Sequence, residues 1–173
     1  MSYIRNFRLE DLFKINQVNL DPLTETYGLC FYMKYMIHWP SLFKVSEHPN
    51  GRIMGYIMGK TEGQNENLHG HVTALSIAPD YRRLGLAESL MKHLEDYSDR
   101  QNCYFVDLFV RVSNTVAITM YKKLGYTIYR RVLNYYAGDF SEDAFDMRKA
   151  LSRDVEKKSI IPLPHPVTPD EVD

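Results

Sequence analysis

The chain has 173 residues, 45% of them hydrophobic and 13% aromatic, which is enough to bury one hydrophobic core. Its 21 basic and 22 acidic residues nearly cancel, so no overall field draws it to nucleic acid, and a general DNA or RNA binder is disfavoured. No apolar run approaches the roughly 18–20 residues that span a bilayer, and the first ten residues lack the layout of a signal peptide, so we expect a cytoplasmic protein without membrane contact.

The N-terminal third predicts one strand, two helices and a hairpin. Residues 3–7 have the pattern of a short strand, and the apolar positions that follow Glu10 and Asp11 predict a helix over residues 10–18. Residues 29–38 predict a second helix, apolar on most sides, which Pro40 ends. Residues 42–47 and 52–58 are strand-like and are separated by a turn signal, which predicts an antiparallel pair.

The middle of the chain predicts a strand, helix and strand in succession. Residues 59–70 are polar and contain glycine, which predicts a loop, and residues 71–77 return to a β-rich pattern. Helical periodicity follows at Leu86, Leu90 and Leu94, and residues 104–110 read as a buried strand. These elements resemble a crossover unit.

The last third predicts a helix, a strand, a further helix and a tail. A helix face recurs over residues 116–124, with Gly125 as its left-handed cap, and residues 126–136 predict a strand. Residues 143–151 predict one more short helix. The order is that of an α+β domain over residues 1–151, followed by an extended, proline-punctuated tail over residues 152–173.

The most informative stretch is a basic turn that opens the helix after the central strand. It reads Tyr81-Arg82-Arg83-Leu84-Gly85-Leu86-Ala87. A helix N-terminus presents unpaired N–H groups and a partial positive charge, and small residues at Gly85 and Ala87 let a pyrophosphate approach the backbone. Arg82 and Arg83 add charge. An ordinary strand-to-helix turn with two solvated arginines is the alternative for this motif alone.

These residues resemble the cofactor signature of the GNAT acetyltransferase superfamily, Arg/Gln-x-x-Gly-x-Gly/Ala, at Arg82, Gly85 and Ala87. The resemblance implies a mixed, mostly antiparallel central sheet flanked by helices, with two central strands splayed around acetyl-CoA. It further implies that a later segment, with Asn114 and Tyr121, approaches the thioester. The cofactor positions that it implies are Leu75, Ser76, Ile77, Arg82, Arg83, Leu84, Gly85, Leu86, Ala87, Asn114 and Tyr121.

Over nearly the whole chain the sequence resembles the catalytic subunits of NatB N-terminal acetyltransferases. The segments that carry this resemblance include His38-Trp39-Pro40 and residues 20–28, 55–60, 69–76, 107–114 and 147–166. It implies acetylation of the initiator methionine of chains beginning Met-Asp, Met-Glu, Met-Asn or Met-Gln. It also implies a heterodimer with a large helical-repeat auxiliary subunit, which brings the enzyme to nascent peptides at the ribosome. Apolar residues on the first two predicted helices exceed what those helices bury alone, which favours such an interface: Phe13, Ile15, Phe31, Met33, Tyr35 and Met36. Self-association and ordinary core packing are the alternatives.

The reaction is attack of a neutral amine on a thioester. An α-amino group titrates near ~7.7–8.0, so about a tenth is neutral at pH 7 and no strong base is needed. Water held by the carbonyls of Thr73 and Leu75, or Glu25, is our candidate for accepting the proton. Tyr121 is our candidate for the acid that protonates the thiolate; a core tyrosine is the alternative.

Substrate recognition is expected from the loop at residues 20–28, the central strand and the strand after Arg131. Pro22, Leu23, Tyr27 and Val72 are candidate walls for the methionine side chain, and Glu25 is a candidate partner of the substrate ammonium. Tyr135 and Tyr136 are adjacent, so in a regular strand only one of them faces the substrate, and we favour Tyr136. The remaining candidates for substrate contact are Gly28, Thr73 and Ala74.

His71 is the candidate that reads the second substrate residue, because an imidazole can hydrogen-bond Asp, Glu, Asn or Gln. A strand histidine satisfied by a neighbour is the alternative. His69-Gly70-His71 has no third ligand at a suitable spacing, so we expect no metal site.

Two other functions use the same turn. A lysine or small-amine acetyltransferase needs a strong base, and residues 71–77 contain no carboxylate, which favours an α-amine substrate. A non-enzymatic CoA-binding module is the second alternative, and it predicts binding without turnover.

Overall fold

The computed structural model describes residues 2–20 and 22–172, and its centre is one mixed sheet. In that part of the chain the sheet has seven strands in the order β1-β2-β3-β4-β5-β7-β6. Only β4 and β5 pair in parallel; the other neighbours are antiparallel. The strands are β1 (Tyr3–Asn6), β2 (Phe43–Glu47), β3 (Ile53–Glu62), β4 (His69–Ile77), β5 (Phe105–Arg111), β6 (Thr127–Tyr136) and β7 (Glu142–Ala150). The predicted α+β layout is confirmed.

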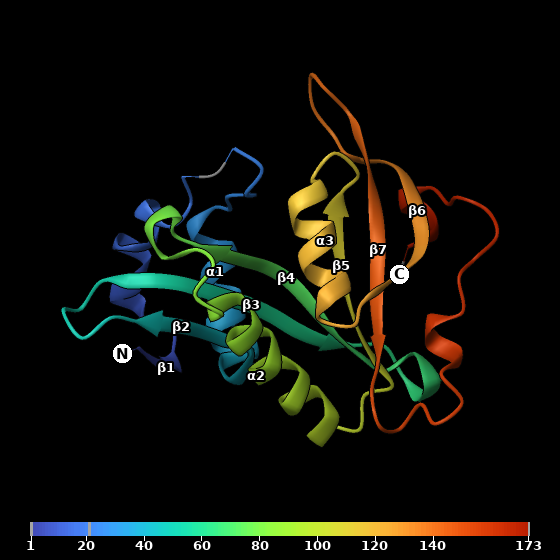
Figure 1. The fold of residues 1–173 in the computed structure, drawn as a ribbon, viewed down its shortest axis with the longest axis horizontal. Helices are drawn as coiled ribbons and strands as arrows, with labels where there is room; N and C mark the ends of the chain where they lie inside the picture. Colours follow the sequence, from blue (N-terminus) through green and yellow to red (C-terminus); the bar gives the residue numbers. More distant parts are fainter. Residues whose placement is uncertain (1, 21, 173) are drawn as a thin grey trace.

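In the described part of the chain, three α-helices cover the sheet from two sides. They are α1 (Leu29–His38), α2 (Leu86–Arg100) and α3 (Thr115–Lys123). In Figure 1, α2 and α3 lie in front of the sheet and α1 lies behind it. The core is divided in the same way: Leu90, Leu94 and Ile118 from α2 and α3 pack in one cluster, and α1 contributes Tyr32 and Tyr35 to another.

The strands β4 and β5 separate part-way along their length. Their pairing runs only from His69 with Phe105 to Val72 with Leu108, although β4 continues to Ile77 and β5 to Arg111. Figure 1 shows the two strands diverging from their paired ends. Beyond Val72, the edge of β4 that faces β5 has no partner strand among the described residues. The splayed central strands implied by the resemblance are therefore present.

A bulge in β4 lies where this separation begins. Met58 pairs with Ala74 and Gly59 pairs with Val72, so the register between β3 and β4 skips Thr73. A bulge adds one residue and re-aims the strand, and it leaves the polar groups of the extra residue available to other partners. The bulge and the end of the β4–β5 pairing fall at neighbouring residues.

The helix predicted for residues 143–151 is wrong, because this segment is the strand β7. It lies between β5 and β6 and pairs with both, so its backbone is hydrogen-bonded on two edges. Apolar Phe145 and Met147 face the α3 side, while the opposite face carries Ala144 and the buried Asp146. Because both faces are buried, the alternation that marks a half-exposed strand is weak.

The helix predicted for residues 10–18 is replaced by two 3₁₀ turns, η1 (Leu9–Phe13) and η2 (Ile15–Gln17). The buried Asp11 accepts the backbone N–H of Arg8 at 2.8 Å and two hydrogen bonds from Arg5 on β1. These bonds tie the first turn to the sheet and stop it from propagating. The remaining 3₁₀ turns are η3 (Pro40–Leu42), η4 (Asn65–Asn67), η5 (Pro79–Tyr81), η6 (Lys158–Ile160) and η7 (Pro169–Glu171).

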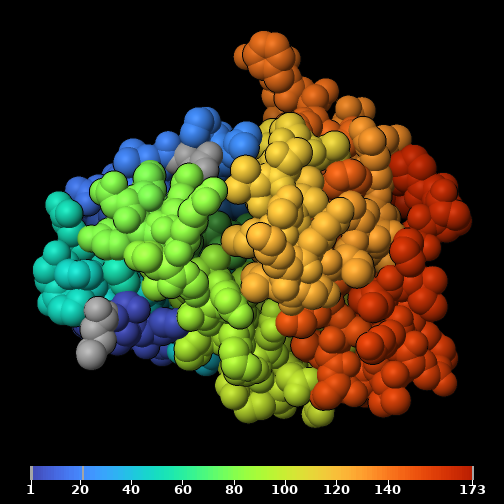
Figure 2. Space-filling view, viewed as in Figure 1, coloured from blue at the N-terminus to red at the C-terminus, as the bar shows by residue number. Residues whose placement is uncertain are grey.

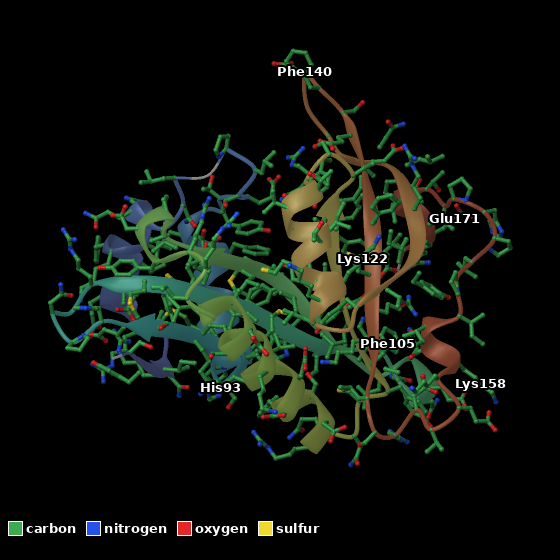
Figure 3. All side chains as sticks on the ribbon, in the orientation of Figure 1. His93, Phe105, Lys122, Phe140, Lys158 and Glu171 are labelled. Atoms are coloured by element: carbon green, nitrogen blue, oxygen red, sulfur yellow. The ribbon has the colours of Figure 1, made fainter. Side chains whose placement is uncertain are left out.

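The predicted loop at residues 59–70 is shorter than expected, because β3 and β4 extend into it and pair as far as Glu62 with His69. The turn between β6 and β7 projects from the body of the molecule, with Phe140 at its tip in Figure 3, 91% exposed. Among the described residues no helix is both long and apolar enough to cross a membrane.

The tail docks on β6. Leu163 donates its backbone N–H to Tyr129, Val167 donates to Arg131, and Leu133 donates to Val167. Val167 also bridges Val132 in parallel and is buried with it. The last described residues thus lie along the strand that ends the sheet, although the division of the chain at residue 151 stays a prediction. Met1 and Asp173, at the ends of these two predicted units, lie outside the described residues.

Candidate active site

The turn that joins β4 to α2 places two left-handed residues beside the unpaired N–H groups of the helix start, here called the N–H array. Arg83 has φ +60° and Gly85 has φ +76°, so two left-handed residues alternate with ordinary ones just before the helix. A Cβ built at Gly85 meets nothing within 4 Å, so glycine serves the backbone conformation rather than a close contact. Gly85 is the N-cap of α2, whose first N–H groups have no helical partner. This arrangement suits an anionic group such as a diphosphate.

Side chains around this turn divide between surface and core. Arg82 and Arg83 are exposed, and Arg82 donates from Nε to the carbonyl of Ile77 at 3.3 Å. Leu84 is exposed, Ala87 is half-buried, and Leu86 is buried under the helix. Of the predicted cofactor positions in the turn, Leu86 therefore offers its backbone only.

The free edge of β4 leads from this turn toward the centre of the sheet. On its other edge, Leu75 pairs with Ile57, Ser76 with Tyr56 and Ile77 with Gly55, so this part of β4 pairs regularly with β3. Figure 2 shows the surface indented between the green atoms of α2 with its preceding turn and the yellow atoms of α3. An extended ligand with amide groups can pair with the open edge as a neighbouring strand would.

Asn114 directly precedes α3 and Tyr121 lies on that helix, beside the separated strands. Asn114 caps the helix, and its side-chain oxygen accepts the backbone N–H of Ala117 at 3.2 Å. Tyr121 is buried, and burial raises the pKa of its hydroxyl. No described residue hydrogen-bonds that hydroxyl, so the phenol keeps its proton and has it available for another partner.

The bulged Thr73 ties the central strand to α1 and to the loop before it. Tyr35 on α1 is hydrogen-bonded to Thr73 Oγ1 at 2.7 Å, and Tyr27 donates its hydroxyl to the Thr73 carbonyl at 3.4 Å. Burial raises the pKa of Tyr27, whose ring stacks on Phe31 with 4.4 Å between centroids. The bulge therefore positions residues on the α1 side of the gap, opposite Tyr121.

Glu25 is paired with a residue that the sequence did not single out. Its carboxylate forms an ion pair with Arg111 at the end of β5, and the same guanidinium pairs with Glu142 at 3.4 Å. The Arg111 guanidinium also lies 4.0 Å from the centroid of the Tyr136 ring. Arg111 thus joins the predicted substrate loop to β6 and β7. The signals in the sequence were its place directly after the strand predicted over residues 104–110 and within residues 107–114, which carry the family resemblance.

Tyr135 and Tyr136 do not face opposite sides, as a regular strand requires. The register between β6 and β7 is irregular from Val132 to Tyr136, and Asn134 has φ +51°. This distortion brings the two rings into edge contact, 5.1 Å between centroids. Tyr135 stacks on Phe109 of β5 at 4.7 Å. The premise that the two rings face opposite sides was wrong because it assumed an unbroken strand; which tyrosine meets the substrate stays a prediction.

His71 lies on β4 next to a buried carboxylate on β5. Its Nδ1 is 2.7 Å from Asp107 Oδ1, so the alternative of a histidine satisfied by a neighbour holds for this nitrogen. His69 Nε2 lies 3.6 Å from the other oxygen of Asp107 and 3.4 Å from Glu62. Among the described residues no group of three potential ligands is arranged to hold a metal ion.

The remaining predicted substrate residues are not brought together as one pocket. Pro22, Leu23 and Gly28 are exposed in the loop before α1, whereas Val72 is buried in the core under α2 and α3. Ala74 is half-buried against the α1 cluster. Val72 is thus separated from the loop residues by the sheet. Asp21, within the predicted substrate loop, lies outside the described residues.

Comparison with known proteins decides the family. A sequence model of the Acetyltransferase (GNAT) family matches residues 9–126, which include the turn, the separated strands and α3. The chain belongs to the GNAT acetyltransferase family. It is 62% identical to the N-terminal acetyltransferase B complex catalytic subunit NAA20 of Arabidopsis thaliana, over 100% of this chain and 99% of that protein.

Similarity to solved structures extends over nearly the whole of this chain. Chaetomium thermophilum Naa20, solved with a bisubstrate analogue, superposes with a TM-score of 0.92 at 45% identity, covering 97% of each chain. A chain of the NatB acetyltransferase complex bound to a bisubstrate inhibitor gives a TM-score of 0.87 at 44% identity, covering 99% of each. The similarity therefore includes β6, β7 and the tail.

Two of the apolar residues that were expected to be exposed for partner binding are buried in the structure. Ile15 and Tyr35 are buried in the core, and Phe31 and Met36 are half-buried against it. Phe13 and Met33 remain exposed. The structure adds other exposed apolar residues on or beside α1, namely Leu20, Leu29 and Ile37.

Proposed function

We propose that this chain transfers the acetyl group of acetyl-CoA to the α-amino group of the initiator methionine in proteins that begin Met-Asp, Met-Glu, Met-Asn or Met-Gln. The observation that carries this proposal is the opening between β4 and β5, which runs from the N–H array at Gly85 toward Tyr121. Full-length similarity to NatB catalytic subunits supports the peptide specificity.

The residues present fit acetyl-CoA. The left-handed Arg83 and Gly85 aim backbone N–H groups at a diphosphate, and the exposed arginines add positive charge. The free edge of β4 at Leu75, Ser76 and Ile77 offers amide partners to the pantetheine arm. When bound, acetyl-CoA supplies its acetyl group as a thioester.

Groups of this chain then accept the proton from the amine and supply the proton to the thiolate. No carboxylate lies on β4, and an α-amine with a pKa near ~7.7–8.0 is partly neutral at pH 7, so a water held by the Thr73 and Leu75 carbonyls suffices as acceptor. Tyr121 holds the proton to be delivered to the leaving thiolate, since burial keeps its hydroxyl neutral.

The peptide is proposed to enter from the α1 side. Tyr27, Tyr135 and Tyr136 form its aromatic surroundings, and Glu25 faces them while paired with Arg111. His71 lies deeper, where we propose that it meets the second residue. Replacing His71 by alanine is expected to weaken acetylation of Met-Asp peptides while acetyl-CoA binding is retained.

The proposed partner is a large helical-repeat auxiliary subunit, in a heterodimer that works on nascent chains at the ribosome in the cytoplasm. Leu29, Met33 and Ile37 are exposed along α1, and Phe13 at the end of η1 is 84% exposed. Such apolar residues mark an interaction surface. The similarity to a chain solved within the NatB complex supports this partner class. No direct contact with nucleic acid or membrane is proposed.

The test compares peptides of defined first residues. The full chain, co-expressed with its candidate auxiliary subunit, is supplied with acetyl-CoA and with peptides beginning Met-Asp, Met-Leu or Ser-Ser, and with a peptide whose only free amine is lysine. Preferred acetylation of the Met-Asp peptide is expected. Equal or better turnover of the lysine peptide would establish the lysine alternative, and CoA binding without turnover of any peptide would establish a binding module.

A further inference from the structure

One buried carboxylate holds two histidines between β4 and β5. Asp107 is 4% exposed and lies directly opposite His71 in the parallel register. Its Oδ1 is 2.7 Å from His71 Nδ1, and its Oδ2 is 3.6 Å from His69 Nε2. The Asp107 side chain is not needed to pair β4 with β5, because backbone hydrogen bonds hold the two strands together.

The protons on these groups follow from their partners. Burial opposes ionisation of Asp107, but the charges of His71, His69 and Arg148 and the His71 hydrogen bond together lower its pKa. An ionised carboxylate only accepts hydrogen bonds, so the hydrogen between the two groups is on His71 Nδ1. The second ring nitrogen, Nε2, is then an acceptor in the neutral ring and a donor in the charged ring.

His69 does not share this freedom. Its Nδ1 donates to the Asn67 carbonyl at 2.6 Å, and its Nε2 faces the carboxylates of Glu62 and Asp107. Burial acts against the charge, but the Glu62 hydrogen bond and the Asp107 charge raise the pKa of His69 overall. Both its nitrogens are committed, so His69 has a structural role.

The free nitrogen of His71 is on the side of the proposed peptide site. Among the described residues, Asp107 alone hydrogen-bonds the His71 ring, whose centroid lies 5.6 Å from that of Phe109. Phe109 stacks on Tyr135, and Tyr135 contacts Tyr136. An aromatic chain therefore leads from His71 to the tyrosines around the peptide.

We propose that Asp107 is a positioning residue that fixes hydrogen on His71 Nδ1 and so makes the protonation of Nε2 decide which second substrate residue is read. This rests on the proposed function. Asp and Glu side chains offer only acceptors and need the charged ring, which donates from Nε2. Asn and Gln offer a donor and an acceptor, so they pair with either form of the ring.

The consequence is a selectivity that depends on pH. The substrate α-amine titrates alike in peptides that differ only at the second residue, and a peptide Asp stays ionised above pH 6. The ratio of kcat/KM for Met-Asp over Met-Asn therefore falls as the pH rises, because only the doubly protonated ring donates from Nε2 to a carboxylate. Other charged or titratable groups around this site are Lys60 and Glu62 on β3, His69 on β4, Arg130 and Tyr135 on β6, Asp146 and Arg148 on β7, and Tyr35 on α1.

The experiment measures this ratio for the wild-type chain with its auxiliary subunit, and for Asp107→Asn. The asparagine oxygen still accepts from Nδ1, but it carries no charge to favour the imidazolium. We expect kcat/KM for Met-Asp to fall about tenfold and for Met-Asn about twofold, with the decline of the ratio moved to lower pH. Asp154→Asn is the matched control, since that aspartate is also buried but accepts the backbone N–H of Ser159 within the tail, away from β4 and β5.

The outcomes separate this inference from the proposed function. Turnover of neither Met-Asp nor Met-Asn peptides would refute the proposed function itself. Turnover of both with a ratio that is flat with pH in the wild type would overturn only the role of Asp107 and His71, and this measurement holds even if Asp107→Asn does not fold. Equal loss for both peptides in a folded Asp107→Asn, with an unmoved pH profile, would reduce Asp107 to a structural residue.

Discussion

The two sides of the sheet contribute different kinds of groups to the proposed site: backbone groups on one side and paired side chains on the other. On the α2 and α3 side, the diphosphate position and the strand edge consist of backbone groups, set by left-handed residues and by the loss of one strand pairing. On the α1 side, Glu25, Arg111 and His71 are held by side-chain pairs between distant segments. A backbone site depends on local conformation, whereas a side-chain site depends on every partner. The two sides should therefore respond differently to substitution.

The largest effect is expected at the one side chain that the α3 side contributes to chemistry. Tyr121→Phe removes the proposed acid and leaves the ring in the core, so kcat should fall about 100-fold with little change in KM for either substrate. Steady-state kinetics on a Met-Asp peptide measure this. Tyr126→Phe is the control, because the Tyr126 hydroxyl donates to Glu95 at 2.9 Å and does not face the gap between β4 and β5. A wild-type kcat in Tyr121→Phe would show that Tyr121 is not the acid.

Substitution of Gly85 tests the backbone-built side. Gly85→Val forces a β-branched residue into the left-handed region, at a cost of about 1–2 kcal/mol, and disturbs the N–H array, so acetyl-CoA should bind about tenfold more weakly. Calorimetric titration with acetyl-CoA checks the affinity. Gly51→Val carries the same conformational strain at φ +86° in the β2–β3 turn, and an equal loss of affinity there would assign the effect to stability.

Substitution of Arg111 tests the side-chain-built side. Arg111→Gln leaves Glu25 and Glu142 without their shared partner, so KM for the peptide should rise about fivefold while the affinity for acetyl-CoA is unchanged. Arg131→Gln, which breaks a pair with Asp143 within the β6–β7 hairpin, is the control. A parallel loss of acetyl-CoA binding in Arg111→Gln would contradict the separation of the two sides.

The smallest effect concerns stability and pH. The pKa of His69 is raised in the folded state, so its contribution to stability is full below its unfolded value and is lost as the pH rises through the folded value. His69→Gln should therefore destabilise the protein by about 1 kcal/mol more at pH 6 than at pH 9. Urea unfolding at the two pH values measures this difference, and an equal loss at both would mean that the His69 ring matters only for its stacking on Phe105.

The sequence predicted the backbone-built side better than the other. The turn around Gly85, the cap at Gly125 and the helix α3 follow from local patterns, and the structure has them. The segment that became β7 was mistaken for a helix because burial on both faces hides a strand's alternation. Tertiary partners, rather than local propensity, decide such a segment.

Sequence patterns could not predict which distant residues pair with each other. Arg111 and Glu25 are separated by 86 positions, and His71 and Asp107 by 36, so neither pair leaves a periodic signal. The distortion at Asn134, which turns Tyr135 and Tyr136 toward each other, also depends on how β7 and the tail meet β6. Family resemblance supplied several of these residues as candidates, but their partners became visible only in the fold.

The docked tail has a consequence for how this protein behaves in concentrated solution. β6 ends the sheet, and an uncovered terminal strand is a template on which another chain can add its own strand. Val167 occupies part of that rim through its bridge to Val132, and the prolines around it cannot donate further bonds outward. The segment around Val167 thus leaves less of this rim open for a strand of another copy to pair with.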